Sequence, residues 1–287
     1  MITPDTRTAL HRFRHDAMAC TFEVLLVGDD AKYARQAATA AFAEVDQLEQ
    51  LLSRFLPESD IAQINALQPG QSVRVSVKTI ECLQLASRVY TETGGVFDIA
   101  YRSAGPRSDA APLVLDPKNH AVGVQKAGVR LDLGGLGKGY ALDQMATVLR
   151  EWSVQAALVH SGRSTVYAIG APPRAKGWSV ALRAPDASGE SLETMILRNE
   201  ALAGSGQRLH GRHIVDPRGE DTPGEDAAAW AGAPSAALAD ALSTAFLLMP
   251  PTEVEALCRR LTGVWAILHD DCSTGERLRR FPAHGGR

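Results

Sequence analysis

The stretch LDLGGLGKGYALD, residues 131–143, sets four glycines around Lys138 and carries an aspartate near each end, Asp132 and Asp143. Residues 129–133 are rich in β-formers and predict a strand, whereas residues 140–152 predict a helix. A strand that runs through glycines into a helix suits an anion, because free backbone N–H groups and the helix dipole favour negative charge. The spacing is neither GxxxxGK[ST] nor GxGxxG, so a tight, closely packed turn remains an alternative.

On both sides of this stretch, helical and strand-like patterns alternate without a repeat or a clean linker. Apolar residues at three- and four-residue spacing predict helices at 30–53, 79–93, 235–248 and 252–261. Segments rich in β-formers predict strands at 20–27, 72–77, 156–160, 165–169, 178–183, 194–198, 201–203 and 264–269. Residues 100–121 show little periodicity and predict a long loop. The sequence therefore predicts a single-domain α+β fold with mixed or antiparallel sheets flanked by helices.

The composition is that of a globular protein and argues against several other classes of protein. The chain has 287 residues, of which 45% are hydrophobic and 22% charged, as is ordinary for a globular protein with a sizeable core. A net charge of −3 argues against nucleic acid as a partner. The four cysteines are far apart and predict neither a zinc site nor a disulfide framework. The sequence has no signal-like apolar stretch and no membrane-spanning run, so we expect a cytoplasmic protein.

The stretch SAALADALSTAFLLM, residues 235–249, places one carboxylate in an otherwise apolar helix. Asp240, Ser243 and Thr244 lie at i, i+3 and i+4 and so share a helical face. A buried carboxylate without a partner costs several kcal/mol, so a neutralising group is expected. Hard oxygen ligands on one face suit Mg²⁺ or Ca²⁺. The alternative is a structural helix in which both hydroxyls bond back to preceding carbonyl groups.

Two further stretches contain candidate residues. In GRHIVDPRGED, residues 211–221, His213 precedes a β-branched pair and a turn, and a lone histidine is either structural or catalytic. In TGGVFDIA, residues 93–100, a helix stop precedes Phe97 and Asp98, which alone indicates little.

Taken in order, six stretches resemble the FAD:protein FMN transferase (ApbE) family. They are MACTFEV, LSRFLPESDIAQIN, TGGVFDIA, LDLGGLGKGYALD, HIVDP and ADALSTAF, and the resemblance spans about residues 18–268. It implies an ApbE-like, T-fold-related domain over residues 18–281, an N-terminal extension at 1–17 and a disordered tail at 282–287. The chain would be a shortened, cytoplasmic-type member.

The resemblance also implies a reaction and its residues. Members of the family bind FAD with Mg²⁺ and transfer its FMN portion to a threonine or serine hydroxyl of an acceptor flavoprotein, releasing AMP. By resemblance, Asp240 and Thr244 bind the metal, Ser243 assists, and the carbonyl of Gly135 completes the protein ligands. His213 would accept the proton of the acceptor hydroxyl. The expected cofactor-binding residues are Met18, Phe55, Val96, Phe97, Asp98, Asp132, Lys138 and Val215.

The chain departs from the family pattern in several places. The segment between Asp98 and Leu131 is short, Ile99 replaces a common proline, and DPxTG becomes DPRGE. In HSGRST, Arg163 and Ser164 replace a glycine and an acidic or amide residue, so Arg163 either contacts phosphate or forms a surface salt bridge. Hydrolysis of FAD, an FAD carrier or sensor, and a flavin-dependent oxidoreductase therefore remain alternatives to transfer.

Overall fold

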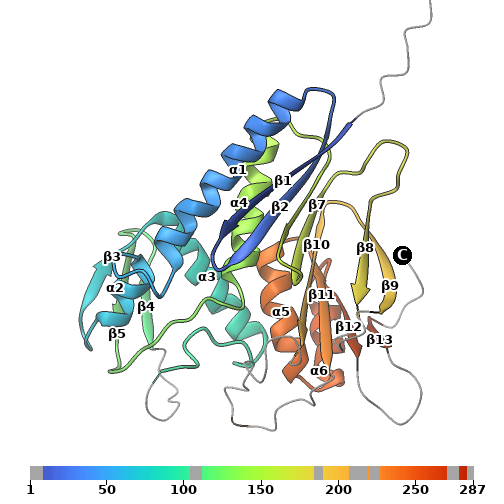
Figure 1. Cartoon of the computed structure of the whole chain (residues 1–287). Helices are drawn as coiled ribbons and strands as arrows, with labels where there is room; N and C mark the ends of the chain where they lie inside the picture. Colours follow the sequence, from blue (N-terminus) through green and yellow to red (C-terminus); the bar gives the residue numbers. More distant parts are fainter. Residues whose placement is uncertain are drawn as a thin grey trace, which may run out of the picture.

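An eight-stranded antiparallel sheet runs through the molecule (Figure 1). The computed structural model describes residues 9–103, 112–183, 190–206, 219, 227–269 and 278–282. In sheet order the strands are β1 (Ala9–Ala17), β2 (Cys20–Gly28), β6 (Ala157–Ser161), β7 (Thr165–Ile169), β10 (Glu200–Gly206), β11 (Ala228–Ala233), β12 (Trp265–His269) and β13 (Leu278–Phe281). A small sheet contains β3 (Ser72–Arg74), β5 (Ala121–Val124) and β4 (Leu113–Asp116), and β8 (Trp178–Arg183) pairs with β9 (Ser191–Leu197).

The described residues also form six helices. They are α1 (Ala31–Leu52), α2 (Asp60–Ala66), α3 (Val77–Glu92), α4 (Gly137–Glu151), α5 (Ala236–Leu248) and α6 (Pro251–Arg260). All strand pairs among these residues are antiparallel, which confirms the predicted α+β class with its antiparallel sheets. None of these helices combines the length and apolar character that crossing a bilayer requires.

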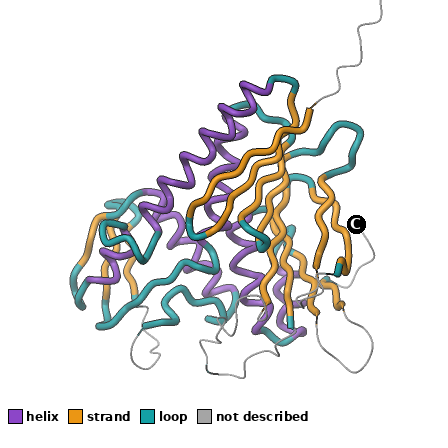
Figure 2. The backbone as a smooth tube through the Cα atoms, viewed as in Figure 1, coloured by secondary structure: helices purple, strands orange, loops and turns teal. Residues whose placement is uncertain are grey.

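Both faces of the large sheet are covered. Figure 2 shows helices on one side of it and the β8–β9 hairpin on the other. On β11, Ala229 and Ala231 face the helices, whereas Trp230 joins Trp178 and Trp265 in a cluster under the hairpin. Because side chains alternate along a strand, small residues on one face let α5 approach the sheet closely. This double coverage explains why β11 is buried along its whole length.

Several predicted elements differ from the observed ones. Residues 129–133 form no strand. In place of a neighbouring strand, the side-chain amide of Asn65 accepts a hydrogen bond from the N–H of Leu131 at 2.6 Å and donates one to its C=O at 3.2 Å. The loop predicted at 100–121 contains β4. Residues 9–17, which we expected to precede the domain, form β1 at the edge of the large sheet. At α2, the side chain of Ser59 caps the helix by accepting a hydrogen bond from the N–H of Ala62.

Candidate functional site

Helices α4 and α5 cap each other. The carboxylate of Asp240, on α5, accepts a hydrogen bond from the backbone N–H of Gly139 in the first turn of α4, at 3.1 Å. In return Asp143, on α4, accepts from the N–H groups of Ala236 and Ala237 at the start of α5, at 2.7 and 2.9 Å. Each carboxylate thus satisfies donors that a helix leaves unpaired and lies at the positive end of the other helix dipole.

Asp240 is nearly buried, with 5% of its surface exposed. Its second oxygen accepts a hydrogen bond from the hydroxyl of Thr165, on β7, at 3.0 Å. Among the described residues, each carboxylate oxygen therefore has one donor, while an ionised carboxylate offers about four acceptor positions in total. Two well-placed donors hold the group in one orientation and leave it with capacity to bind a cation.

The two hydroxyls of the predicted metal face lie in different surroundings. Ser243 is fully buried and Thr244 is partly exposed. Both donate to the backbone carbonyl of Asp240, at 2.9 and 3.3 Å, which is the back-bonding that the structural alternative predicts. Both also contact the hydroxyl of Ser205, on β10. A hydroxyl that donates its hydrogen inward keeps its lone pairs, so Thr244 can still bind a cation on its open side.

The glycine stretch at residues 134–139 lies next to Thr244. A side chain at Gly135 would meet Phe97 at 3.3 Å and the hydroxyl oxygen of Thr244 at 3.4 Å. In the described residues no hydrogen bond reaches the carbonyl of Gly135. Lys138 donates to the carbonyl of Gly134 at 2.8 Å and so folds back over the turn. The residues predicted to bind a metal from two distant segments therefore do lie together.

Asp132, beside this turn, binds the side chains of two arginines. It forms ion pairs with Arg54 and Arg102, at 3.3 and 3.0 Å, and accepts a hydrogen bond from the N–H of Gly134 at 3.0 Å. The guanidinium of Arg54 lies over the ring of Phe55, 4.0 Å from its centroid, and that ring is 75% exposed. Phe55 thus presents an exposed aromatic surface next to Arg54.

The other predicted cofactor-binding residues vary in exposure. Val96 and Phe97 are buried after the end of α3, and Asp98 accepts a hydrogen bond from the N–H of Ala100. Met18 lies in the tight turn between β1 and β2, with a positive φ of 51°, and its N–H donates to Glu49 at 2.8 Å. His213 and Val215 lie outside the described residues.

Sequence reasoning missed several polar residues around Asp240. Thr165 and Ser205 contact the predicted metal face directly, but a hydroxyl near a strand end gives no signal in a sequence. Ser161 pairs with Thr165 across β6 and β7, and in the described part of the chain its buried hydroxyl has no hydrogen-bond partner. An unpaired buried hydroxyl costs about 1–3 kcal/mol, so the Ser161 hydroxyl is free to bond a further polar atom.

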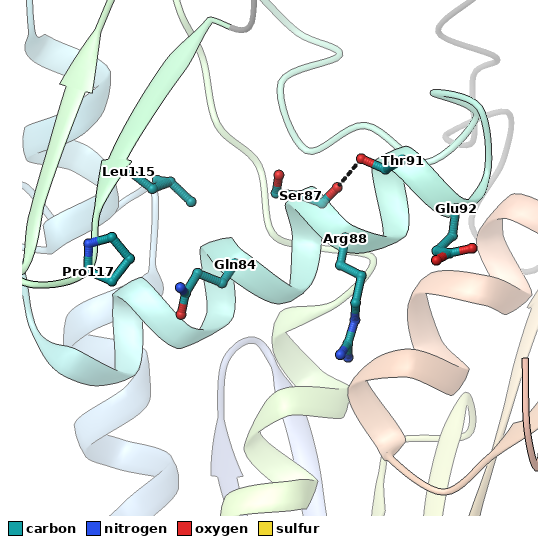
Figure 3. Close-up of a pocket in the computed structure, with 7 residues that line it drawn as sticks. All are labelled: Gln84, Ser87, Arg88, Thr91, Glu92, Leu115 and Pro117. Carbon is teal, nitrogen blue, oxygen red and sulfur yellow. Dashed lines mark hydrogen bonds between the residues drawn. The ribbon is translucent and has the colours of Figure 1, made fainter.

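A separate hollow lies between α3 and β4 (Figure 3). Its volume is about 490 Å³, and none of the predicted site residues lines it. Its lining is Gln84, Ser87, Arg88, Thr91, Glu92, Leu115 and Pro117. In the part of the chain that the structure describes, no three His, Cys, Asp or Glu side chains cluster closely enough to hold a metal ion. A metal at the α4–α5 site would therefore bind one carboxylate together with neutral oxygens.

Comparisons with known proteins all point to one family. Two curated relatives, each named FAD:protein FMN transferase, are 26% identical to the chain. The one from Klebsiella pneumoniae matches over 63% of the chain and 65% of its own length, just under two thirds. The one from Treponema pallidum matches over 79% of the chain and 75% of its own length.

Solved structures show the same fold. An ApbE protein from Thermotoga maritima superposes with a TM-score of 0.80 at 22% identity, covering 96% of this chain and 97% of its own. The flavin transferase ApbE from Vibrio cholerae gives 0.79 at 17% identity, covering 95% and 97%. The model of the ApbE family matches residues 18–268, which include every site residue named above. The chain therefore belongs to the ApbE family.

Proposed function

We propose that this chain transfers the FMN portion of FAD to a threonine or serine hydroxyl of an acceptor flavoprotein, with Mg²⁺, and releases AMP. The observation that carries the proposal is the convergence of Asp240 and Thr244 with the partly exposed turn at Gly135. Membership of the ApbE family and the names of the curated relatives support the same reaction.

The residues at the α4–α5 site fit a magnesium ion. Asp240, Thr244 and the Gly135 carbonyl offer only oxygen atoms, which Mg²⁺ prefers, and the buried Ser243 supports Thr244 through Ser205. Magnesium is commonly held by one or two carboxylates with substrate phosphates completing the shell, so a single carboxylate suits a site that FAD completes. Bound there, Mg²⁺ would neutralise charge on the pyrophosphate and on the departing AMP.

The reaction exchanges one P–O bond for another. The acceptor hydroxyl oxygen forms a bond to the phosphorus of the FMN portion, the bond from that phosphorus to the bridging oxygen breaks, and AMP leaves. We propose that His213 takes the proton of the hydroxyl, because an ordinary histidine pKa of about 6.5 suits a base near neutral pH. Lys138, folded over the glycine turn, supplies a cation beside the pyrophosphate.

The aromatic and apolar residues nearby suit the two ring systems of FAD. We propose that Phe55 stacks on a base, since most of its ring is exposed and Arg54 lies against it. Val96, Phe97 and Asp98 follow α3 beside the glycine turn, Asp132 holds that turn, and Met18 approaches from the β1–β2 hairpin. With Val215, they would form the flavin and adenine pockets.

One incubation separates transfer from its alternatives. The chain is mixed with FAD, Mg²⁺ and candidate acceptor flavoproteins, and the products are followed by AMP release and by flavin fluorescence on a denaturing gel. Transfer predicts AMP together with a fluorescent acceptor band. AMP without labelled protein would indicate hydrolysis, and intact bound FAD without AMP would indicate a carrier.

The role of His213 has its own test. His213→Ala should bind FAD with unchanged affinity and lose transfer by about 10²-fold or more, the range typical of general-base removal. A variant that binds FAD and transfers at the wild-type rate would show that His213 is not the base.

A further inference from the structure

The turn between β6 and β7 carries a cation whose role the proposed function leaves open. Arg163 stands at its tip, is exposed, and forms no ion pair in the described part of the chain. The other two arginines beside the site differ from it, since Arg54 and Arg102 are both paired with Asp132. Within the described residues, no carboxylate therefore neutralises the charge of Arg163.

Both ends of this turn are attached to the site. On one side Thr165 lies two residues after Arg163 and donates to Asp240, which puts the Cα of Arg163 within about 7 Å of the Cα of Thr165. The carbonyl of Ser164 accepts a hydrogen bond from the N–H of Gly204, at 2.7 Å, next to Ser205. The turn is thus fixed directly beside the proposed metal face.

The other end of the turn reaches the start of β2. The N–H of Gly162 donates to the carbonyl of Thr21 at 2.8 Å, and a side chain at Gly162 would lie 3.0 Å from the sulfur of Cys20. Burial raises the pKa of the Cys20 thiol, and the charges of Lys138 and Asp240 both act on it. The turn therefore packs against the start of β2, next to Cys20.

A cation at this tip changes what the site can bind. The exposed guanidinium of Arg163 gives this edge of the site a positive charge. A guanidinium recognises phosphate through paired N–H donors and is charged at any working pH. The unpaired hydroxyl of Ser161, at the base of the same turn, indicates that a further polar group belongs on its inner side.

We propose that Arg163 contacts the pyrophosphate of FAD and sets the preference of the site for FAD over flavins that lack it. The proposal rests on the proposed function for its substrate. It makes Arg163 a specificity-determining residue, one that adds a charge-assisted contact next to the metal face.

The test compares equilibrium binding of FAD and riboflavin by flavin fluorescence, at low and high NaCl, for wild type, Arg163→Gln and Arg163→Lys. Because a hydrogen bond to a charged group is lost, Arg163→Gln should bind FAD roughly tenfold or more weakly and bind riboflavin as the wild type does. Its FAD affinity should also fall less steeply with salt. Arg163→Lys should recover part of the FAD affinity, because the charge remains without the paired geometry.

Arg88→Gln is the matched control, since Arg88 is exposed on α3 in the separate hollow and its loss changes net charge equally (Figure 3). The proposal is overturned if Arg163→Gln binds FAD with the wild-type affinity and salt dependence, or if it matches Arg88→Gln in both. The comparison needs neither acceptor nor turnover. Failure of wild-type transfer would count against the proposed function, while the Arg163 result is read from FAD affinity and its salt dependence alone.

Discussion

At the scale of single residues, Gly139 decides how closely α4 approaches α5. A side chain there would lie 2.3 Å from the carbonyl oxygen of Ala236 and within 3 Å of two more backbone atoms of α5. The same residue supplies the N–H that holds Asp240. Gly139 thus positions the Asp240 carboxylate in two ways: it lets α5 pack closely against α4, and its N–H donates to the carboxylate.

The Gly139→Ala substitution should therefore destabilise the protein. The added methyl group forces the helices apart, and we expect a loss of about 3 kcal/mol in the free energy of unfolding, measured by urea titration. Gly137→Ala is the control from the same stretch, because its added methyl group would make only an ordinary contact with Leu133 at 3.6 Å. It should be neutral or stabilise by about 0.5 kcal/mol. Equal effects of the two substitutions would contradict this account.

At the scale of elements, the reciprocal caps make α4 and α5 one unit. Asp143 is the partner of Asp240 in this arrangement, and it also accepts a hydrogen bond from the hydroxyl of Ser235 at 2.7 Å. Burial raises the pKa of Asp143, and its hydrogen bonds from Ala237, Ala236 and Ser235 oppose that effect. This cap fixes where α5 begins, and it therefore also fixes the position of Asp240 relative to the glycine turn.

The Asp143→Asn substitution should cost about 1–3 kcal/mol of unfolding free energy, because the amide cannot accept all of these hydrogen bonds and leaves a buried donor unpaired. The same substitution would let the start of α5 move, so we also expect weaker Mn²⁺ binding in the presence of FAD. Asp29→Asn, which removes the same charge from an exposed position, controls for net charge. If Asp143→Asn unfolded at the same urea concentration as Asp29→Asn, the reciprocal cap would not contribute to the free energy of unfolding.

The sequence predicts most of the helices and strands but not how they are joined at the site. Periodicity located α1 and α3 within a few residues because each has one apolar face, whereas α5 was recognisable as a nearly continuous apolar run. The strand predicted at 129–133 does not form, and the backbone of Leu131 bonds to the side chain of Asn65 on α2 instead. No local sequence pattern could predict this contact, because the two residues are 66 positions apart. Asp240 could be recognised from the sequence because it is a carboxylate in an otherwise apolar helix. Thr165 and Ser205 could not, because only the folded chain brings their hydroxyls next to Asp240 and Thr244.

At the scale of the whole molecule, an ion cluster around one buried glutamate joins three strands at the edge of the large sheet. Glu23 on β2 is nearly buried and pairs with Arg12 and Arg14 of β1 and with His160 of β6. His160 also contacts the carbonyl of Gly162, so the cluster extends to the turn that bears Arg163. Burial alone would raise the pKa of Glu23, but hydrogen bonds from Arg12, Arg14 and His160 outweigh it and lower the pKa to about 2.

This cluster predicts a specific loss of stability in acid. The folded-state pKa of Glu23 lies below its ordinary value of 4.5, so its contribution is complete above that pH and disappears as the pH falls from about 4.5 towards 2. We expect about 1–3 kcal/mol, reduced by solvent because both arginines are more than half exposed. Unfolding free energies of wild type and Glu23→Gln should differ at pH 6 and converge near pH 2. A difference independent of pH would contradict the assignment.

The site as a whole is assembled from segments far apart in the chain. The glycine turn, the start of α5, the end of β10 and the β6–β7 turn meet at Asp240, which is held by donors from α4 and β7. This arrangement places one fixed carboxylate, one hydroxyl and one carbonyl beside several cations. Under the proposed function, it would hold a divalent ion whose coordination the pyrophosphate of FAD completes.

The measurement that tests this most directly is Mn²⁺ binding in the presence of FAD, followed by the EPR signal of the free ion. Wild-type chain should show one site per molecule. Asp240→Asn, which keeps the shape of the side chain, should lose more than about tenfold in affinity, since even outer-shell partners of a metal typically contribute 10–100-fold. Wild-type Mn²⁺ affinity in folded Asp240→Asn would show that the α4–α5 site does not hold the metal.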